Sequence, residues 1–201
     1  MSQTFIRALK KVLDAEGVYS KDPNDPGNWT EGKVGKGILK GTKFGISAAS
    51  YPNLDIINLT IEQAENIYRR DFWDRLNLSN IAIIQSPLVA DMLFNVAVNC
   101  GTGNAGKFLQ RVINALVIQE HLPITPQRLS LWQQAVLEII SNKALKVDGI
   151  IGPITLRVLK KIPHRMAIAS GIFGESYNHY IAGKIIYRAG WLNRIGNSYL
   201  T

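Results

Sequence analysis

The sequence predicts a mainly α (α+β) fold: a helical body, a small β-hairpin lobe near the N-terminus and a helical C-terminal part. Apolar residues recur at helical spacing over most of the 201 residues. A segment near the front, residues 20–47, holds six of the 17 glycines and interrupts that spacing. Hydrophobic residues make up 46% and charged residues 19% of the chain, a composition that excludes intrinsic disorder.

The first helix is predicted near the N-terminus. Its apolar stripe consists of Phe5, Leu9, Val12 and Leu13. Glu16 continues the same face, because it lies eleven residues after Phe5. A glycine follows and ends the helix.

Short strands are predicted within residues 20–47. The alternation at Lys33-Val34 and Ile38-Leu39, and then at Phe44-Gly45-Ile46, favours short strands joined by glycine turns. Two prolines and six glycines exclude a regular helix from this segment.

Helices are expected over most of the remaining chain. Thr60 and Gln63 form a capping box that opens a helix to about residue 73. Ser86-Pro87 opens an apolar helix to about residue 99, which we expect to be the central buried helix. Further helices are predicted over residues 103–116, from Thr125-Pro126 to residue 141, over residues 154–160, and as two stretches separated by residues 171–174.

The charge is strongly positive, at +8, and predicts a polyanionic partner. The segment 160–201 has six basic residues and one acidic residue. We expect this basic tail to attract anionic envelope polymers or lipopolysaccharide; a solvated helical face is the alternative. Charge alone also suggests nucleic acid, but no nucleic-acid motif supports it, so no nucleic-acid partner is predicted.

Glu16 is the main catalytic candidate. A carboxyl group held against apolar neighbours has a raised pKa, and a carboxylic acid that stays protonated near neutral pH can act as a general acid. A solvent-exposed glutamate at a frayed helix end is the alternative. Asp22 and Asp25 follow in a turn, where aspartate before proline is common. A second carboxylate at this spacing also suits glycoside hydrolysis, which uses a pair of carboxyl groups.

Several motifs, in order, make the chain resemble glycoside hydrolase family 108, the lysozyme-like N-acetylmuramidases common as phage endolysins. The motifs are Glu16–Tyr19, Asp22–Gly27, Thr42–Ser47, Phe94–Gly101, Val147–Thr155 and Gly190–Arg194. The last two are similar to a C-terminal peptidoglycan-binding module that accompanies the family. The resemblance implies a lysozyme-like fold with a cleft between lobe and body, a catalytic region over residues 1–98 and a peptidoglycan-binding-like region over residues 99–201.

The resemblance also implies site residues. Glu16 matches the catalytic acid of the family's Glu-Gly-Gly-Tyr motif, in which Val18 replaces the second glycine here. Asp25 and Thr42 match the aspartate and threonine that follow the acid in phage-type lysozymes. An insertion of about a dozen residues, 30–41, makes Thr30 a rival to Thr42.

Three further residues are candidates for substrate binding. Tyr19 matches the motif tyrosine, Trp29 lies in the turn, and Asn99 lies near a helix end. Each has a structural alternative: Tyr19 and Trp29 could instead pack the loop, and Asn99 could instead cap its helix. Asp148-Gly149 is interpreted first as a turn, and a sugar-binding role there rests on the resemblance alone.

The predicted activity is hydrolysis of the β-1,4 bond between N-acetylmuramic acid and N-acetylglucosamine in peptidoglycan. Glu16 would protonate the leaving oxygen, and Asp25 or a water set by Thr42 would act on the opposite face of the sugar. A lytic transglycosylase acting on the same bond and a non-catalytic peptidoglycan-binding protein are the alternatives.

No cofactor or metal is predicted, because the three histidines have no metal-ligand spacing. The single cysteine, Cys100, excludes an intrachain disulfide, and we expect a buried, inert thiol and a monomeric protein. Charges interrupt any apolar core in residues 1–17, so no Sec signal is expected. We therefore expect synthesis in the bacterial cytoplasm and action at the cell wall after release by a holin or a secretion system.

Overall fold

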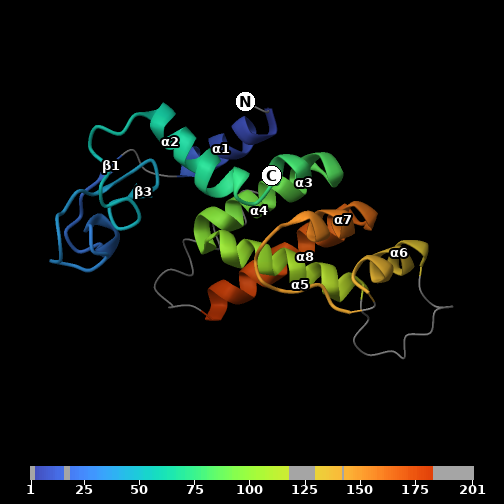
Figure 1. Ribbon diagram of the computed structural model, residues 1–201. Helices are drawn as coiled ribbons and strands as arrows, with labels where there is room; N and C mark the ends of the chain where they lie inside the picture. The colour runs from blue at the N-terminus through green and yellow to red at the C-terminus, as the bar shows by residue number, and fades with distance from the viewer. Residues whose placement is uncertain (1–2, 16–18, 118–129, 142, 183–201) are drawn as a thin grey trace. The chain divides into compact units, whose positions relative to one another are not determined.

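The computed structural model describes residues 3–15, 19–117, 130–141 and 143–182. They form a mainly helical fold with one small antiparallel sheet, so the predicted fold class is confirmed (Figure 1). Contacts divide the chain into two compact units. The smaller unit comprises residues 6–71, and the larger unit comprises residues 1–5 with 72–201. The predicted functional boundary at residue 98 stays a prediction.

The first helix, α1, runs from Gln3 to Ala15. Phe5, Leu9 and Val12 are buried, as their spacing predicts. In the smaller unit the sheet strands are β1 (Tyr19–Ser20), β2 (Thr42–Lys43) and β3 (Ile46–Ser47). A 3₁₀ turn, Pro26–Asn28, lies between β1 and β2. Helix α2 covers Ile61–Tyr68 and begins with the predicted capping box at Thr60.

The three strands pair in the order β1-β2-β3, all antiparallel. Phe44 and Gly45 form the two-residue turn between β2 and β3, with φ of 52° and 75°. Positive φ at both central positions is typical of a type I′ hairpin turn, whose twist matches that of the strands. The prediction of a strand over 44–46 is therefore wrong at its first two residues, and Lys33-Val34 lies in a turn rather than a strand.

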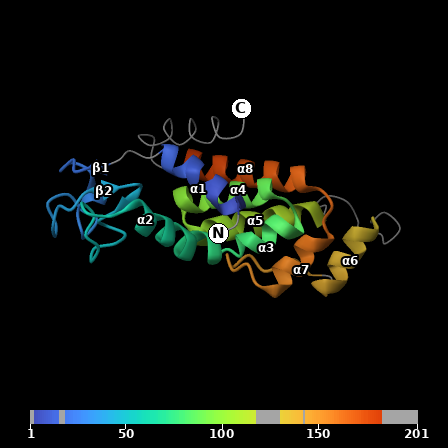
Figure 2. The ribbon, with the colours of Figure 1, turned by 90° about the horizontal axis from the view of Figure 1, so that it is seen from above.

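The larger unit is built from helices. They are α3 (Leu78–Ile84), α4 (Pro87–Cys100), α5 (Thr102–Val117), α6 (Leu131–Ile139), α7 (Pro153–Lys161) and α8 (Arg165–Ala182). Helices α4, α5 and α8 pack against one another, and α3 and α6 each contact α7 (Figure 2). Helix α4 is buried along most of its length, which confirms the prediction of a central buried helix.

An aromatic cluster forms part of the core of the larger unit. The rings of Phe5, Trp73 and Phe94 meet edge to face, with centroids 5.3–6.0 Å apart. Edge-to-face contact is favourable because the positive edge of one ring faces the negative face of another. The buried indole N–H of Trp73 donates to the hydroxyl of Ser79 at 2.8 Å, so this polar group is satisfied.

Two helix predictions need correction. Helix α2 ends at Tyr68, and a π-helix, Arg69–Asp74, replaces its predicted last turn. The predicted helix start at residue 125 lies outside the described residues; within them, helix α6 follows a capping box at Ser130. Helix α8 runs unbroken through residues 171–174, where a separation was predicted. Helix α3 was not predicted. No helix among the described residues is long and apolar enough to span a membrane.

Gly171 lies where α8 passes close to α5, which explains why a glycine occurs within this helix. A Cβ atom there would lie 2.7 and 2.8 Å from the two methyl carbons of Val112 on α5, so glycine allows the two helices to approach closely. At Gly174, in the same helix, a Cβ atom would meet nothing within 4 Å.

These two glycines give a matched prediction. Gly171→Ala should lower the free energy of unfolding by about 1–3 kcal/mol, because the β-branched side chain of Val112 cannot turn both of its methyl groups away from the new Cβ atom. Gly174→Ala should raise it by up to about 1 kcal/mol through helix propensity. Chemical denaturation of both variants measures the difference, and equal effects at the two positions would contradict the close approach of α5 and α8.

Candidate functional site

Glu16 lies outside the described residues. The chain leaves α1 at Ala15 and enters β1 at Tyr19. Glu16 is joined through Gly17 and Val18 to that strand. Its role as the acid and the raised pKa of its carboxyl group stay predictions, and the site is described here from the polar residues of the smaller unit.

Asp25, the second candidate carboxylate, caps the turn that follows it in the chain. Its Oδ1 accepts from the backbone N–H of Gly27 at 2.8 Å, which caps the 3₁₀ turn. Asp22 makes a similar turn, because its Oδ1 accepts from the N–H of Asn24 at 2.9 Å. The predicted turn role of both aspartates is therefore confirmed. Asp25 remains exposed to solvent, and a catalytic role for it stays a prediction.

Asn28 is the centre of this loop, and sequence reasoning did not identify it as such. Its side chain is fully buried, with 0% exposure. The side-chain Nδ2 donates to the carbonyl of Asp22 at 3.0 Å, and Oδ1 accepts from the hydroxyl of Thr42 at 2.7 Å. Its backbone carbonyl accepts from the N–H groups of Lys40 and Gly41, both at 3.0 Å. One buried residue thus joins the turn of residues 22–27 to the start of β2.

The hydroxyl group of Thr42 has a fixed role as a hydrogen-bond donor to Asn28. Its hydrogen is donated to Oδ1 of Asn28, since the amide nitrogen of Asn28 is occupied by a carbonyl acceptor. The remaining lone pairs of Thr42 Oγ1 can therefore only accept. Ser20 and Ser47 lie opposite Thr42 on the neighbouring strands, so three hydroxyl-bearing residues share one face of the sheet.

Thr30 has a different role from Thr42. Its Oγ1 accepts from the N–H of Ile38 at 2.9 Å, and its own N–H donates to the carbonyl of Ile38 at 3.1 Å. An isolated bridge between Trp29 and Leu39 continues this pairing. Thr30 therefore closes the base of the inserted loop, while Thr42 is the threonine bonded to the Asp22–Asn28 turn.

Trp29 is half-buried and holds the same turn. Its indole Nε1–H donates to the carbonyl of Pro23 at 2.8 Å. This contact supports the loop-packing interpretation of Trp29. Its role in stacking on a sugar ring stays a prediction.

Tyr19 lies on β1 and is 37% exposed. Its hydroxyl donates to the carbonyl of Lys40 at 3.2 Å, and its ring lies against Gly41, where a Cβ atom would come within 2.9 Å of the ring. Tyr19 also lines a cavity of about 290 Å³ in the smaller unit, with Lys21, Leu39, Lys40, Asn53, Asp55, Ile56 and Ile57. Loop packing is thus observed for Tyr19, and its place on a cavity leaves its ring available to a ligand.

A second polar group in the smaller unit was missed by sequence reasoning. The hydroxyl of Tyr51 donates to Asp71 Oδ2 at 2.8 Å, and the guanidinium of Arg70 contacts both oxygens of the same carboxylate at 2.6 and 2.7 Å. Burial and the hydrogen bond to Asp71 raise the pKa of Tyr51 well above its usual range. This group ties the loop after β3 to the π-helix, a contact that no local sequence pattern signals.

Asn99 lies near the end of α4 in the larger unit. Its Nδ2 donates to the carbonyl and to the side-chain oxygen of Asn95, each at 2.8 Å. Gly101 follows at φ 85° and ends the helix. This arrangement supports the helix-end role of Asn99, and its contact with an N-acetyl group stays a prediction.

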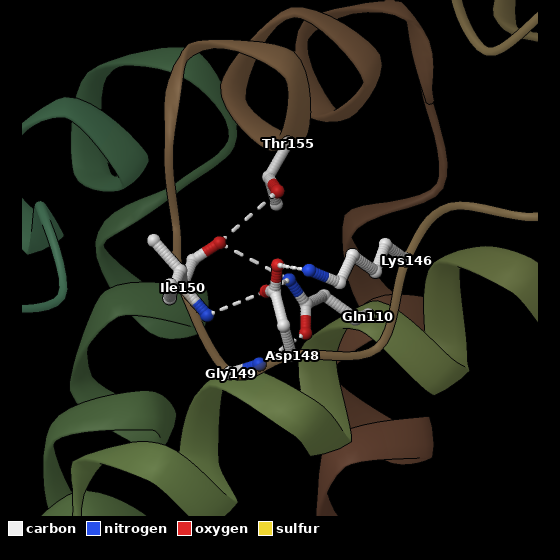
Figure 3. A network of polar contacts seen from close by, with 6 residues as sticks. All are labelled: Gln110, Lys146, Asp148, Gly149, Ile150 and Thr155. Atoms are coloured by element: carbon white, nitrogen blue, oxygen red, sulfur yellow. Dashed lines mark hydrogen bonds and ion pairs between the residues drawn. The ribbon is translucent and has the colours of Figure 1, made fainter.

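The Asp148-Gly149 turn is built on α5 (Figure 3). Buried Gln110 donates from Nε2 to Asp148 Oδ1 at 2.9 Å and to the carbonyl of Ile150 at 3.1 Å. Its Oε1 accepts from the N–H of Gly149 at 2.7 Å. Gly149 has φ of 82°, which confirms the predicted turn with glycine at positive φ. The hydrogen bond from Gln110 is the largest cause of the lowered pKa of Asp148, followed by that from the N–H of Ile150.

No group of three or more histidine, cysteine, aspartate or glutamate side chains that could hold a metal ion occurs within the described residues. The polar side chains of the smaller unit offer hydroxyl, amide and carboxylate groups.

Comparisons with known proteins agree with this chemistry. Residues 9–101 match the sequence profile of the family described as glycosyl hydrolase 108, which supports a glycoside hydrolase. A solved structure of SagA from Brucella abortus is similar in fold, with a TM-score of 0.66 at 20% sequence identity. The match covers 96% of this chain and 90% of that chain. No match was found among curated proteins.

The lowered pKa of Asp148 gives a prediction of pH dependence. A carboxyl group whose pKa is lower in the folded than in the unfolded protein stabilises the fold above its unfolded pKa of about 3.9, and that contribution is lost as the pH falls through the folded pKa. Asp148→Asn keeps the acceptor oxygen and removes the charge. The wild type should have a higher free energy of unfolding than this variant near about pH 7, and the difference should shrink below about pH 4. Urea denaturation across this range measures it, and a difference independent of pH would contradict the assignment.

Proposed function

We propose that this chain is a peptidoglycan hydrolase that cleaves the β-1,4 bond between N-acetylmuramic acid and N-acetylglucosamine. The observation that carries the proposal is the match of residues 9–101 to a glycoside hydrolase family. That range contains Glu16 and the whole smaller-unit network around Asn28 and Thr42.

Glu16 is the proposed general acid. Glycoside hydrolysis needs a carboxylic acid to protonate the leaving oxygen as positive charge develops on the sugar. Glu16 continues the apolar stripe of α1 by its sequence position, and its neighbours in the stripe, Leu9 and Val12, are buried. An apolar setting would raise its pKa, which is the property that a general acid needs.

Thr42 is the residue proposed to orient water on the face of the sugar opposite the acid. Because its hydrogen is committed to Asn28, its oxygen can only accept a hydrogen bond, as a residue that orients an attacking water must. The exposed carboxylate of Asp25, which caps the turn containing Asn28, is suited to stabilising positive charge on the sugar. A fixed acceptor for water favours hydrolysis over the transglycosylase reaction, in which no water attacks.

The larger unit has a proposed role in substrate retention. Residues 99–201 would bind peptidoglycan, and the basic tail would bind anionic envelope polymers or lipopolysaccharide. Because peptidoglycan lies outside the cytoplasmic membrane, we propose release through a holin or a dedicated secretion system.

The central test of the acid is Glu16→Gln. This variant should release soluble fragments from labelled peptidoglycan about 10²–10⁴-fold more slowly than the wild type, because general acid catalysis contributes about that much. Glu31→Gln, at an exposed position in the inserted loop, is the matched control and should keep full activity. Full activity of Glu16→Gln, with an unchanged circular dichroism spectrum and melting temperature, would overturn the assignment.

The role of Thr42 is tested by two variants. Thr42→Val keeps the shape and removes the hydroxyl, so kcat should fall about 10- to 100-fold, the equivalent of about 1.4–2.8 kcal/mol. Thr42→Ser keeps the hydroxyl and should keep most of the activity, and KM should change little in either variant. Equal activity of the valine and serine variants would show that the hydroxyl does not take part.

A further inference from the structure

The larger unit contains a cavity of about 440 Å³ that none of the roles above uses. It is lined by the end of α6, the segment that follows it, the start of α7 and one side chain of α5. Its lining includes Gln110, Lys143, Lys146, Asp148 and Ile154. Its volume is within the range of about 300–1,000 Å³ typical of ligand sites.

The walls of this cavity are fixed by two amides of α5. Gln110 holds the Asp148–Ile150 turn through its three hydrogen bonds (Figure 3). Asn114, one helical turn later, donates to the carbonyl of Leu145 at 2.9 Å and accepts from its N–H at 2.8 Å. The turn also touches α5 directly, since a Cβ atom on Gly106 would collide with the backbone carbonyl of Gly149. A preformed cavity requires little ordering when a ligand binds.

The lining has a specific chemical character. Its apolar part is aliphatic, and none of the described lining residues is aromatic. The polar side chains of Gln110 and Asp148 are already used in holding the turn. The exposed ammonium groups of Lys143 and Lys146 remain at the cavity, and Lys146 lies 3.6 Å from Asp148. The cavity thus combines an aliphatic wall with a net positive charge.

We propose that this cavity binds the stem peptide of peptidoglycan. Stem peptides carry alanine methyl groups, which suit an aliphatic wall, and free carboxylates, which suit Lys143 and Lys146. The ligand class rests on the proposed function, because that function supplies peptidoglycan as the substrate. The glycan strand is a poorer ligand, because its hydroxyl and acetamido groups are uncharged and would offer no negative charge to Lys143 and Lys146.

The proposal has a consequence for substrate choice. Retention by the larger unit would depend on the peptides that the glycan carries. The protein would then bind peptide-bearing peptidoglycan more tightly than a glycan stripped of its peptides.

The test is isothermal titration calorimetry with the full chain. The probes are the tripeptide L-Ala-γ-D-Glu-meso-diaminopimelate and, as the saccharide, chitotetraose. The tripeptide should bind, and the Lys143→Gln/Lys146→Gln variant should raise its Kd about tenfold or more. Arg75→Gln/Arg157→Gln, which removes two exposed charges of the larger unit that neither line the cavity nor belong to the basic tail, should leave the Kd unchanged.

The aliphatic wall is tested separately. Ile154 lines the cavity and is 56% exposed, so Ile154→Ser should weaken tripeptide binding without unfolding the protein. Met166→Ser, at a similarly exposed position outside the cavity, is its control. Absence of tripeptide binding, or binding that these cavity variants do not change, would overturn the proposal. Chitotetraose binding that the cavity variants abolish would overturn it in favour of a saccharide site.

Hydrolysis of whole peptidoglycan by the same preparation separates the two proposals. Hydrolysis without tripeptide binding would reject the cavity proposal and leave the enzymatic function standing. Tripeptide binding sensitive to Lys143 and Lys146, without hydrolysis, would support the cavity and reject the enzymatic function.

Discussion

The buried side chain of Asn28 is the constraint on which the arrangement of the smaller unit depends. It is fully buried, and it needs both a donor and an acceptor partner, which the Asp22 carbonyl and the Thr42 hydroxyl provide. Aspartate could not donate here, and an aliphatic residue would remove both hydrogen bonds, to the Asp22 carbonyl and from the Thr42 hydroxyl. One amide therefore fixes both the turn that contains Asp25 and the direction in which the Thr42 hydroxyl points its hydrogen.

In the larger unit, too, side-chain amides hold a segment that has no regular secondary structure. Segments without regular structure lack ladder partners for their backbone groups, and buried groups of this kind must be satisfied elsewhere. Gln110 and Asn114 supply those partners from one face of α5 to the segment before α7. In both units, buried amides hold non-helical segments rigid, and in both units those segments border a cavity or carry the proposed chemistry. Rigid placement is what a site needs if its groups are to act without first being ordered.

Local signals predicted much of the helical fold, because capping is chemistry between near neighbours. Ser86-Pro87 and Gly101 gave the bounds of α4 to within a residue or two. Gly171 was misinterpreted as a break, since a close contact with another helix is invisible in a local pattern. The same limit applies to the site. The turn role of Asp25 could be predicted from its neighbours, but the bond between Asn28 and Thr42 joins residues 14 apart across an insertion.

The most direct test of the account is the mass of the products released from purified peptidoglycan in water enriched in ¹⁸O. The proposed hydrolysis places an attacking water on the muramic acid side of the bond. It therefore predicts one ¹⁸O atom in each new reducing end, and N-acetylmuramic acid at that end. Anhydro ends without ¹⁸O would contradict hydrolysis and indicate a transglycosylase. A labelled N-acetylglucosamine end would contradict the bond assigned here, and no product at all would contradict the enzymatic function.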